Sequence, residues 1–165
     1  MDREPGRLMY ILPLNLWHNV PGDSMATAFR PGQVVQEWLG AKAETDQDLV
    51  RLVERGVSLR SLQTLLDRGL TKDEVFSLII NPRTLKHRRS KRQPLSREES
   101  ERAVRAARVL GRAEAVFTNH EKALRWMRTP KRRLEGRSPM QMLVTEPGAR
   151  LVEEMLVQID EGLIV

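Results

Sequence analysis

The sequence predicts an all-α protein with two helical halves joined by one long helix. From residue 34 onward, apolar residues recur at three- and four-residue steps, which places them on one face of a helix. Ser, Thr or Asn stands just ahead of most of these stretches, as expected of residues that cap helix N-termini. No segment shows a sustained apolar/polar alternation typical of a strand. With three Trp, three Phe and one Tyr in 165 residues, the core must be aliphatic.

The first 45 residues are predicted to form a partly irregular N-terminal extension. Residues 1–33 hold seven Pro or Gly residues and show no periodicity, which favours a flexible tail. The alternative is that Leu8–Leu12 docks as a short extended segment. Residues 34–39 are predicted to form a short helix.

Residues 46–117 are predicted to form one domain, and its first two helices are amphipathic. Asp46–Arg55 has its apolar face at Leu49, Leu52 and Val53 and is followed by Gly56, a residue suited to helix ends. The second helix, over residues 58–66, carries four leucines on one side and ends before Gly69.

Two closely spaced helix starts follow. Thr71 and Glu74 form a capping box, in which each side chain accepts a hydrogen bond from the other residue's backbone. After the apolar residues of this short helix, Asn81 and Pro82 begin the next one about two residues later. Helices joined by so short a turn cross steeply, so the pair is predicted to be a helix-turn-helix.

A second capping box, at Ser96 and Glu99, opens the longest predicted helix, Arg97 to about Phe117. Residues 118–165 are then predicted to form a smaller domain. Its helices begin near Asn119, Ser138 and Thr145, and a basic loop lies between the first two. The last helix ends at Gly162.

The positive charge lies in one segment. Residues 82–112 contain eleven Lys or Arg and three Glu, whereas the rest of the chain is nearly balanced and the whole chain carries +6. A localised basic stripe on a helix is typical of a nucleic-acid contact, because phosphates supply most of the affinity. The alternative is a solvated charged helix.

Helical geometry from Pro82 turns Leu85 toward the core and places Arg83, His87, Ser90 and Lys91 opposite it. Arg83 is predicted to contact a guanine, while Arg88 and Arg89 reach phosphates at the rim. Arginines at 97, 102, 105 and 108 are expected to extend the positive field. The predicted DNA contacts are Arg83, Thr84, Lys86, His87, Arg88, Ser90, Lys91 and Arg92.

Catalysis, metals, cofactors and membranes are not expected. The chain has no cysteine and three widely spaced histidines, so thiolate and multi-histidine metal sites are not predicted. It also lacks a glycine-rich phosphate loop. No apolar run approaches the roughly 20 residues that span a bilayer, and the charged N-terminus is unlike a secretory signal. We expect a cytoplasmic protein.

Residues 46–165 resemble a known family. The segments Ala123-x-x-Trp126, Leu134-x-Gly136-x-Ser138-Pro139 and Thr145-x-x-Gly148-Ala149-x-x-Val152 are similar to the toxin-binding domain of Xre/MbcA/ParS-type antitoxins. Residues 83–88 and 95–100 resemble that family's Xre-like DNA-binding half. Glu135 stands where the family often has Gly, which puts the loop geometry in question.

The resemblance implies an antitoxin that binds a RES-domain toxin, which consumes NAD⁺ or uses it for ADP-ribosylation, and that represses the shared promoter as a homodimer. Arginines of the basic loop could pair with acidic residues of the toxin or occupy the space of a phosphate in its site. The residues implied in toxin binding are Lys131, Arg132, Arg133, Gly136, Arg137, Ser138, Arg150, Leu163, Ile164 and Val165. Trp126, Leu143, Leu151 and Met155 are expected in the core.

Two further possibilities stay open at this point. The chain is alternatively a plain transcription regulator whose C-terminal half only dimerises. The third possibility is a protein-binding module whose basic face grips an acidic partner and which has no operator.

Overall fold

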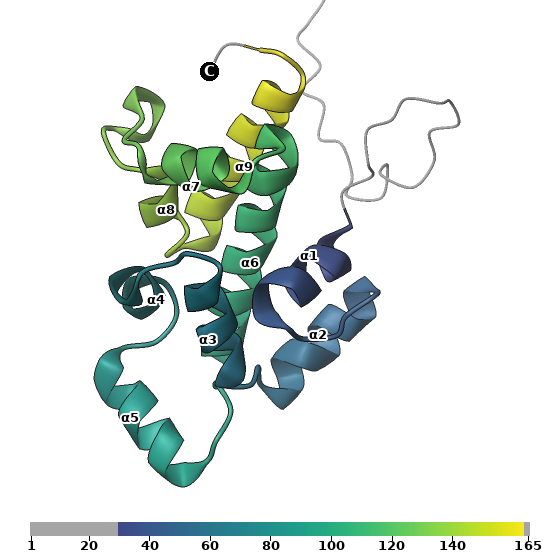
Figure 1. The fold of residues 1–165 in the computed structure, drawn as a ribbon, viewed down its shortest axis with the longest axis vertical. Coiled ribbons are helices and arrows are strands. Elements are labelled where there is room, and N and C mark those ends of the chain that lie inside the picture. The colour runs from purple at the N-terminus through teal and green to yellow at the C-terminus, as the bar shows by residue number, and fades with distance from the viewer. Residues whose placement is uncertain (1–29, 164–165) are drawn as a thin grey trace, which may run out of the picture.

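A computed structural model describes residues 30–163, and within them the protein is all-α, as predicted (Figure 1). The helices are α1 Pro31–Leu39, α2 Asp46–Arg55, α3 Arg60–Asp67, α4 Lys72–Leu78, α5 Pro82–Lys91, α6 Arg97–Phe117, α7 His120–Arg128, α8 Pro139–Met142 and α9 Glu146–Asp160, with a 3-10 turn, η2, at Arg132–Leu134. The predictions for Leu8–Leu12, Ile164 and Val165 lie outside the described residues.

The helix starts follow the capping chemistry of the sequence. Thr71 and Ser96 each accept from the backbone N–H three residues on, and Glu74 and Glu99 accept in return. The Asn81 side chain accepts from the Thr84 N–H at 2.9 Å, which fixes the first turn of α5. Only residues 79–81 separate α4 from α5, and the predicted helix-turn-helix is confirmed.

Helix α6 is the spine of the molecule. It contacts α1, α2 and α4 on the N-terminal side and α7 and α9 on the C-terminal side (Figure 1). Its inward positions are small or aliphatic, including Ala103, Ala107 and Ala113, each fully buried. One continuous apolar cluster therefore runs through both halves.

Helix α1 belongs to the core, although its residues were predicted to lie in an N-terminal extension. It begins at Pro31, three residues earlier than predicted, and buries Val35, Trp38 and Leu39 almost completely. It lies so close to α6 that a Cβ added to Gly111 would stand 1.8 Å from a methyl carbon of Val34. A nine-residue helix carries too little pattern to reveal such long-range packing.

Helix α5 projects from the body at one end of the long axis (Figure 1). Leu85 is its only buried residue. Helices α7 and α8 and the end of α9 lie toward the opposite end. No helix within residues 30–163 is both long and apolar enough to span a bilayer.

Candidate functional site

The outer face of α5 is a cationic surface. Arg83, Lys86, Arg89, Lys91 and the C-cap Arg92 are all exposed. No carboxylate of residues 30–163 forms an ion pair with any of the five. This ten-residue helix and its cap thus present five positive charges to solvent without internal neutralisation.

Three uncharged or weakly basic side chains complete this face. His87 is exposed, and Thr84 is half-buried beside the buried Leu85, as the helical geometry predicted. Ser90 is exposed and donates its hydroxyl proton to the His87 carbonyl at 2.7 Å. The predicted recognition residues therefore lie together on one accessible helix, but whether they contact DNA remains a prediction.

Arg88 differs from its prediction. Its side chain is only 20% exposed, and Nε lies 2.7 Å from Oε2 of Glu99, a close ion pair without the alignment of a hydrogen bond. Nη1 donates to the Pro94 carbonyl at 3.2 Å. Arg88 turns inward because it lies one turn after Leu85, on the side of α5 that faces α6. Its guanidinium does not sit at the rim.

The arginines of α6 that were expected to extend the positive field differ in their surroundings. Arg102 donates from Nε to the Ile79 carbonyl at 3.0 Å, at the end of α4. Arg97 pairs with Glu101, one turn along the helix. The basic segment seen in sequence thus holds exposed cations, including Arg83, Arg89 and Arg97, and arginines in internal contacts, including Arg88 and Arg102.

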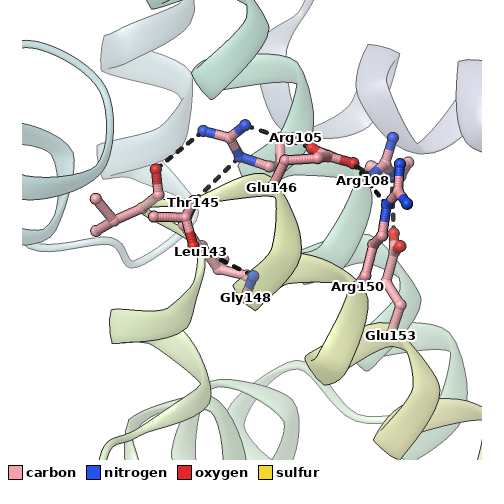
Figure 2. A network of polar contacts seen from close by, with 9 residues as sticks. Arg105, Arg108, Leu143, Thr145, Glu146, Gly148, Arg150 and Glu153 are labelled. Atoms are coloured by element: carbon pink, nitrogen blue, oxygen red, sulfur yellow. Dashed lines mark hydrogen bonds and ion pairs between the residues drawn. The ribbon is translucent and has the colours of Figure 1, made fainter.

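Arg105 and Arg108 fix the C-terminal domain to the spine (Figure 2). Arg105, 13% exposed in its side chain, donates to the carbonyls of Leu143 and Val144 at 3.1 and 3.2 Å. Arg108 pairs with Glu153 on α9 at 2.8 Å. Together they satisfy backbone groups between α8 and α9 and orient α9.

A second cationic surface lies at the loop of residues 131–137, where each cation has a different environment. Lys131 lies 5.0 Å from the centre of the Trp126 ring, and partial burial lowers the pKa of its ammonium. Arg133 donates to Oε1 of Gln158, and Arg137 pairs with Glu135 at 3.2 Å. Arg132 is exposed, and its side chain has no polar partner among the described residues.

The loop backbone adopts a glycine-like conformation. Glu135 and Gly136 have φ of 56° and 80°, both in the left-handed region. Glu135 therefore adopts a backbone conformation that glycine adopts more readily. Nothing lies within 4 Å of a Cβ built at Gly136, so the loop tip is open to close approach.

The other residues implied in toxin binding are dispersed. Ser138 is buried and caps α8 by accepting from the Gln141 N–H, so it is structural. Arg150 is exposed and pairs with Glu146 at 3.6 Å. Leu163 is 55% exposed, and its N–H donates to the carbonyl of Gln158, the residue that also binds Arg133. The loop is thereby tied to the end of α9.

Exposed apolar side chains also lie on the C-terminal half, and one of them was expected to be buried. Leu151 was expected in the core but is 44% exposed, and Val144 is 46% exposed. Leu143 and Met155 are buried as expected, while Trp126 is half-buried against Phe117. Leu151 points outward because α9 buries the stripe that contains Val152, Met155 and Leu156 instead.

One contact between the halves was not foreseen. Arg128 on α7 donates to both carboxylate oxygens of Glu74 on α4, at 2.7 and 2.8 Å, and to the Gly69 carbonyl. Burial acts to raise the pKa of Glu74, but hydrogen bonds from Arg128 and Thr71 hold it below the usual value. Sequence alone cannot reveal this pair, since 54 residues separate its members.

The fold, together with matches to two family models, defines an antitoxin with a helix-turn-helix domain and a toxin-binding domain. Residues 48–108 match the antitoxin Xre-like helix-turn-helix domain, and residues 112–162 match the antitoxin Xre/MbcA/ParS C-terminal toxin-binding domain. The chain belongs to the Xre family of antitoxins. The boundary between the two matches falls within α6.

Named relatives agree with this assignment. "Antitoxin Xre" of Pseudomonas putida is 42% identical over 72% of this chain and 74% of its own length. "Antitoxin Xre" of Yersinia enterocolitica is 32% identical over 76% of this chain and 86% of its own. A "Prs ADP-ribosylating antitoxin" of Sphingobium is 27% identical over 70% of this chain and 79% of its own.

Proposed function

We propose that this antitoxin neutralises a RES-type toxin, which consumes or transfers the ADP-ribose part of NAD⁺, by covering its active site. We further propose that it binds operator DNA as a homodimer and represses its own operon. The observation that carries the proposal is the placement of two cationic surfaces, the outer face of α5 and the 131–137 loop, toward opposite ends of the molecule (Figure 1).

The charges of α5 support DNA binding. Helix α5 is the second helix of the helix-turn-helix and contacts the rest of the protein through one side only. Together with its cap it exposes five cations without ion-pair partners among the described residues, which suits it to a major groove. Arg83 is the candidate for bidentate contact with guanine, and the remaining cations suit phosphates. A two-fold symmetric dimer would require an inverted-repeat operator.

The 131–137 loop supports toxin binding. A guanidinium offered by the antitoxin can pair with acidic residues of the toxin or fill the space that the pyrophosphate of the dinucleotide would take. Among the loop cations, Arg132 is the one best placed to do so. The name of the Sphingobium relative, an ADP-ribosylating antitoxin, supports this choice of toxin chemistry.

Co-expression with the RES-type toxin of a neighbouring reading frame tests neutralisation. The wild-type protein should restore growth, and Arg132→Glu should abolish protection because a carboxylate would be repelled by the acidic toxin residues with which the guanidinium is proposed to pair. Lys122→Glu serves as the matched control, since Lys122 is an exposed cation of the same half that is not among the residues implied in toxin binding. Failure of the wild-type protein to rescue growth would refute the proposed toxin.

Footprinting on the protein's own promoter tests autoregulation and discriminates the alternatives. A plain regulator would protect an operator but have no toxic neighbour. A protein-binding module would give no footprint at physiological salt, where specific complexes survive. The proposal requires both a footprint and rescue.

A further inference from the structure

The contact between Arg88 and Glu99 has a role that its position in a basic helix conceals. Arg88 lies in the last turns of α5, among cations that face solvent, yet its side chain is 20% exposed and that of Glu99 is 8% exposed. Both charges are therefore largely removed from water. Such a pair is retained only where its geometry also satisfies neighbouring polar groups.

The pair also satisfies two neighbouring backbone groups, although Arg88 Nε itself meets Glu99 without the alignment of a hydrogen bond. Arg88 Nη1 reaches the Pro94 carbonyl in the loop after α5. Oε2 of Glu99 accepts from the Ser96 N–H at 2.7 Å, while the Ser96 hydroxyl accepts from the Glu99 N–H. The pair thus joins the end of α5, the connecting loop and the first turn of α6 in one polar unit.

Apart from this unit, α5 has little to hold it. Leu85 is its single buried residue, and Leu85 and Arg88 lie one turn apart on the inward side. A helix anchored at Leu85 alone would be free to pivot about that side chain. The second anchor point fixes the direction in which Arg83, His87 and Lys91 project.

We infer that Arg88 is a positioning residue for DNA recognition: through Glu99 it sets the orientation of α5 and makes no phosphate contact of its own. The inference rests on the proposed DNA binding. It assigns opposite roles to neighbouring arginines, since Arg89 is exposed and unpaired among the described residues, whereas Arg88 is not.

Operator affinity as a function of salt separates these roles. Arg88→Met keeps the apolar stem and removes the pair, and it should weaken binding about tenfold, the size of coupling seen between contacting charged groups. Its slope of log affinity against log salt should equal that of the wild type. Arg89→Ala should reduce the slope by about 0.9, as expected for one lost phosphate contact. A slope for Arg88→Met that matches Arg89→Ala would overturn the inference.

Glu99→Gln is a second test, in which a simple charge effect and the positioning role predict opposite changes in operator affinity. Removing a carboxylate near DNA should strengthen binding if only its charge matters, but it should weaken binding about as much as Arg88→Met if the pair orients α5. Glu98→Gln is the matched control, because Glu98 is the exposed neighbour in the same turn. Equal affinities for the two glutamine variants would contradict the positioning role. Melting curves by circular dichroism must show that each variant is folded at the assay temperature.

Hydrogen exchange provides a readout that does not need DNA. Amides of α5 should lose protection in Arg88→Met and Glu99→Gln and keep it in Arg89→Ala and Glu98→Gln. If the wild-type protein bound no operator, the proposed function would fail while this measurement still decided whether the pair anchors α5. Unchanged protection in all four variants would refute the anchor.

Discussion

At the residue scale, arginine side chains serve three different purposes in this protein. Arg83 is exposed and unpaired within residues 30–163, Arg88 is held in an internal ion pair, and Arg105 binds the carbonyls that precede α9. The count of basic residues in the sequence therefore overstates the cationic surface. Only burial and contacts distinguish a recognition residue from a structural one.

Arg83→Ala should weaken binding to the operator by about 1–3 kcal/mol and relax specificity at one base pair, as expected when a bidentate guanine contact is lost. The measurement is a gel-shift titration on the operator and on single-base variants of it. Arg125→Ala is the control, since Arg125 is an exposed arginine of the other half. Equal affinity of Arg83→Ala and the wild type would remove Arg83 from the recognition face.

At the element scale, local sequence signals predicted where helices begin, but they did not predict how the helices pack against one another. The starts of α4, α5, α6 and α8 follow from side chains that cap them, so their positions could be read within a few residues. The burial of α1, by contrast, depends on its packing against α6, a segment far away in sequence. A pattern of nine residues cannot specify which face of another helix it will meet.

Gly111→Ala should detach or displace α1 and destabilise the protein. Replacing glycine by alanine inside a helix normally gains about 0.5–1 kcal/mol, but the added methyl would overlap Val34, and overpacking costs about 1–3 kcal/mol. We therefore expect a net loss, visible as a lower midpoint in thermal unfolding. Adding Val34→Ala should recover part of it by opening space. A more stable Gly111→Ala protein would show that α1 does not pack on α6 in this way.

At the scale of the whole molecule, both functions share one framework. The apolar cluster is continuous across the two halves, α6 contacts α7 and α9, and Arg128 links α7 to Glu74. Deleting residues 118–165 would uncover α6 and remove this link, so loss of DNA binding in such a fragment would not separate the functions. Point substitutions on the two surfaces are the better tool.

The two surfaces should act independently, and a toxin–antitoxin–DNA complex should form. Helix α6 has 21 residues and so spans about 31 Å, about three times the screening length of charges at 0.1 M salt. Charges at one end therefore contribute little to binding at the other. We expect Arg83→Ala to keep its affinity for the toxin and Arg132→Glu to keep its affinity for the operator. In a gel shift, adding toxin to the complex of wild-type protein and DNA should give a slower-migrating band, which contains all three components. Displacement of DNA by toxin would instead require that the two binding events share a surface or change the orientation of α5.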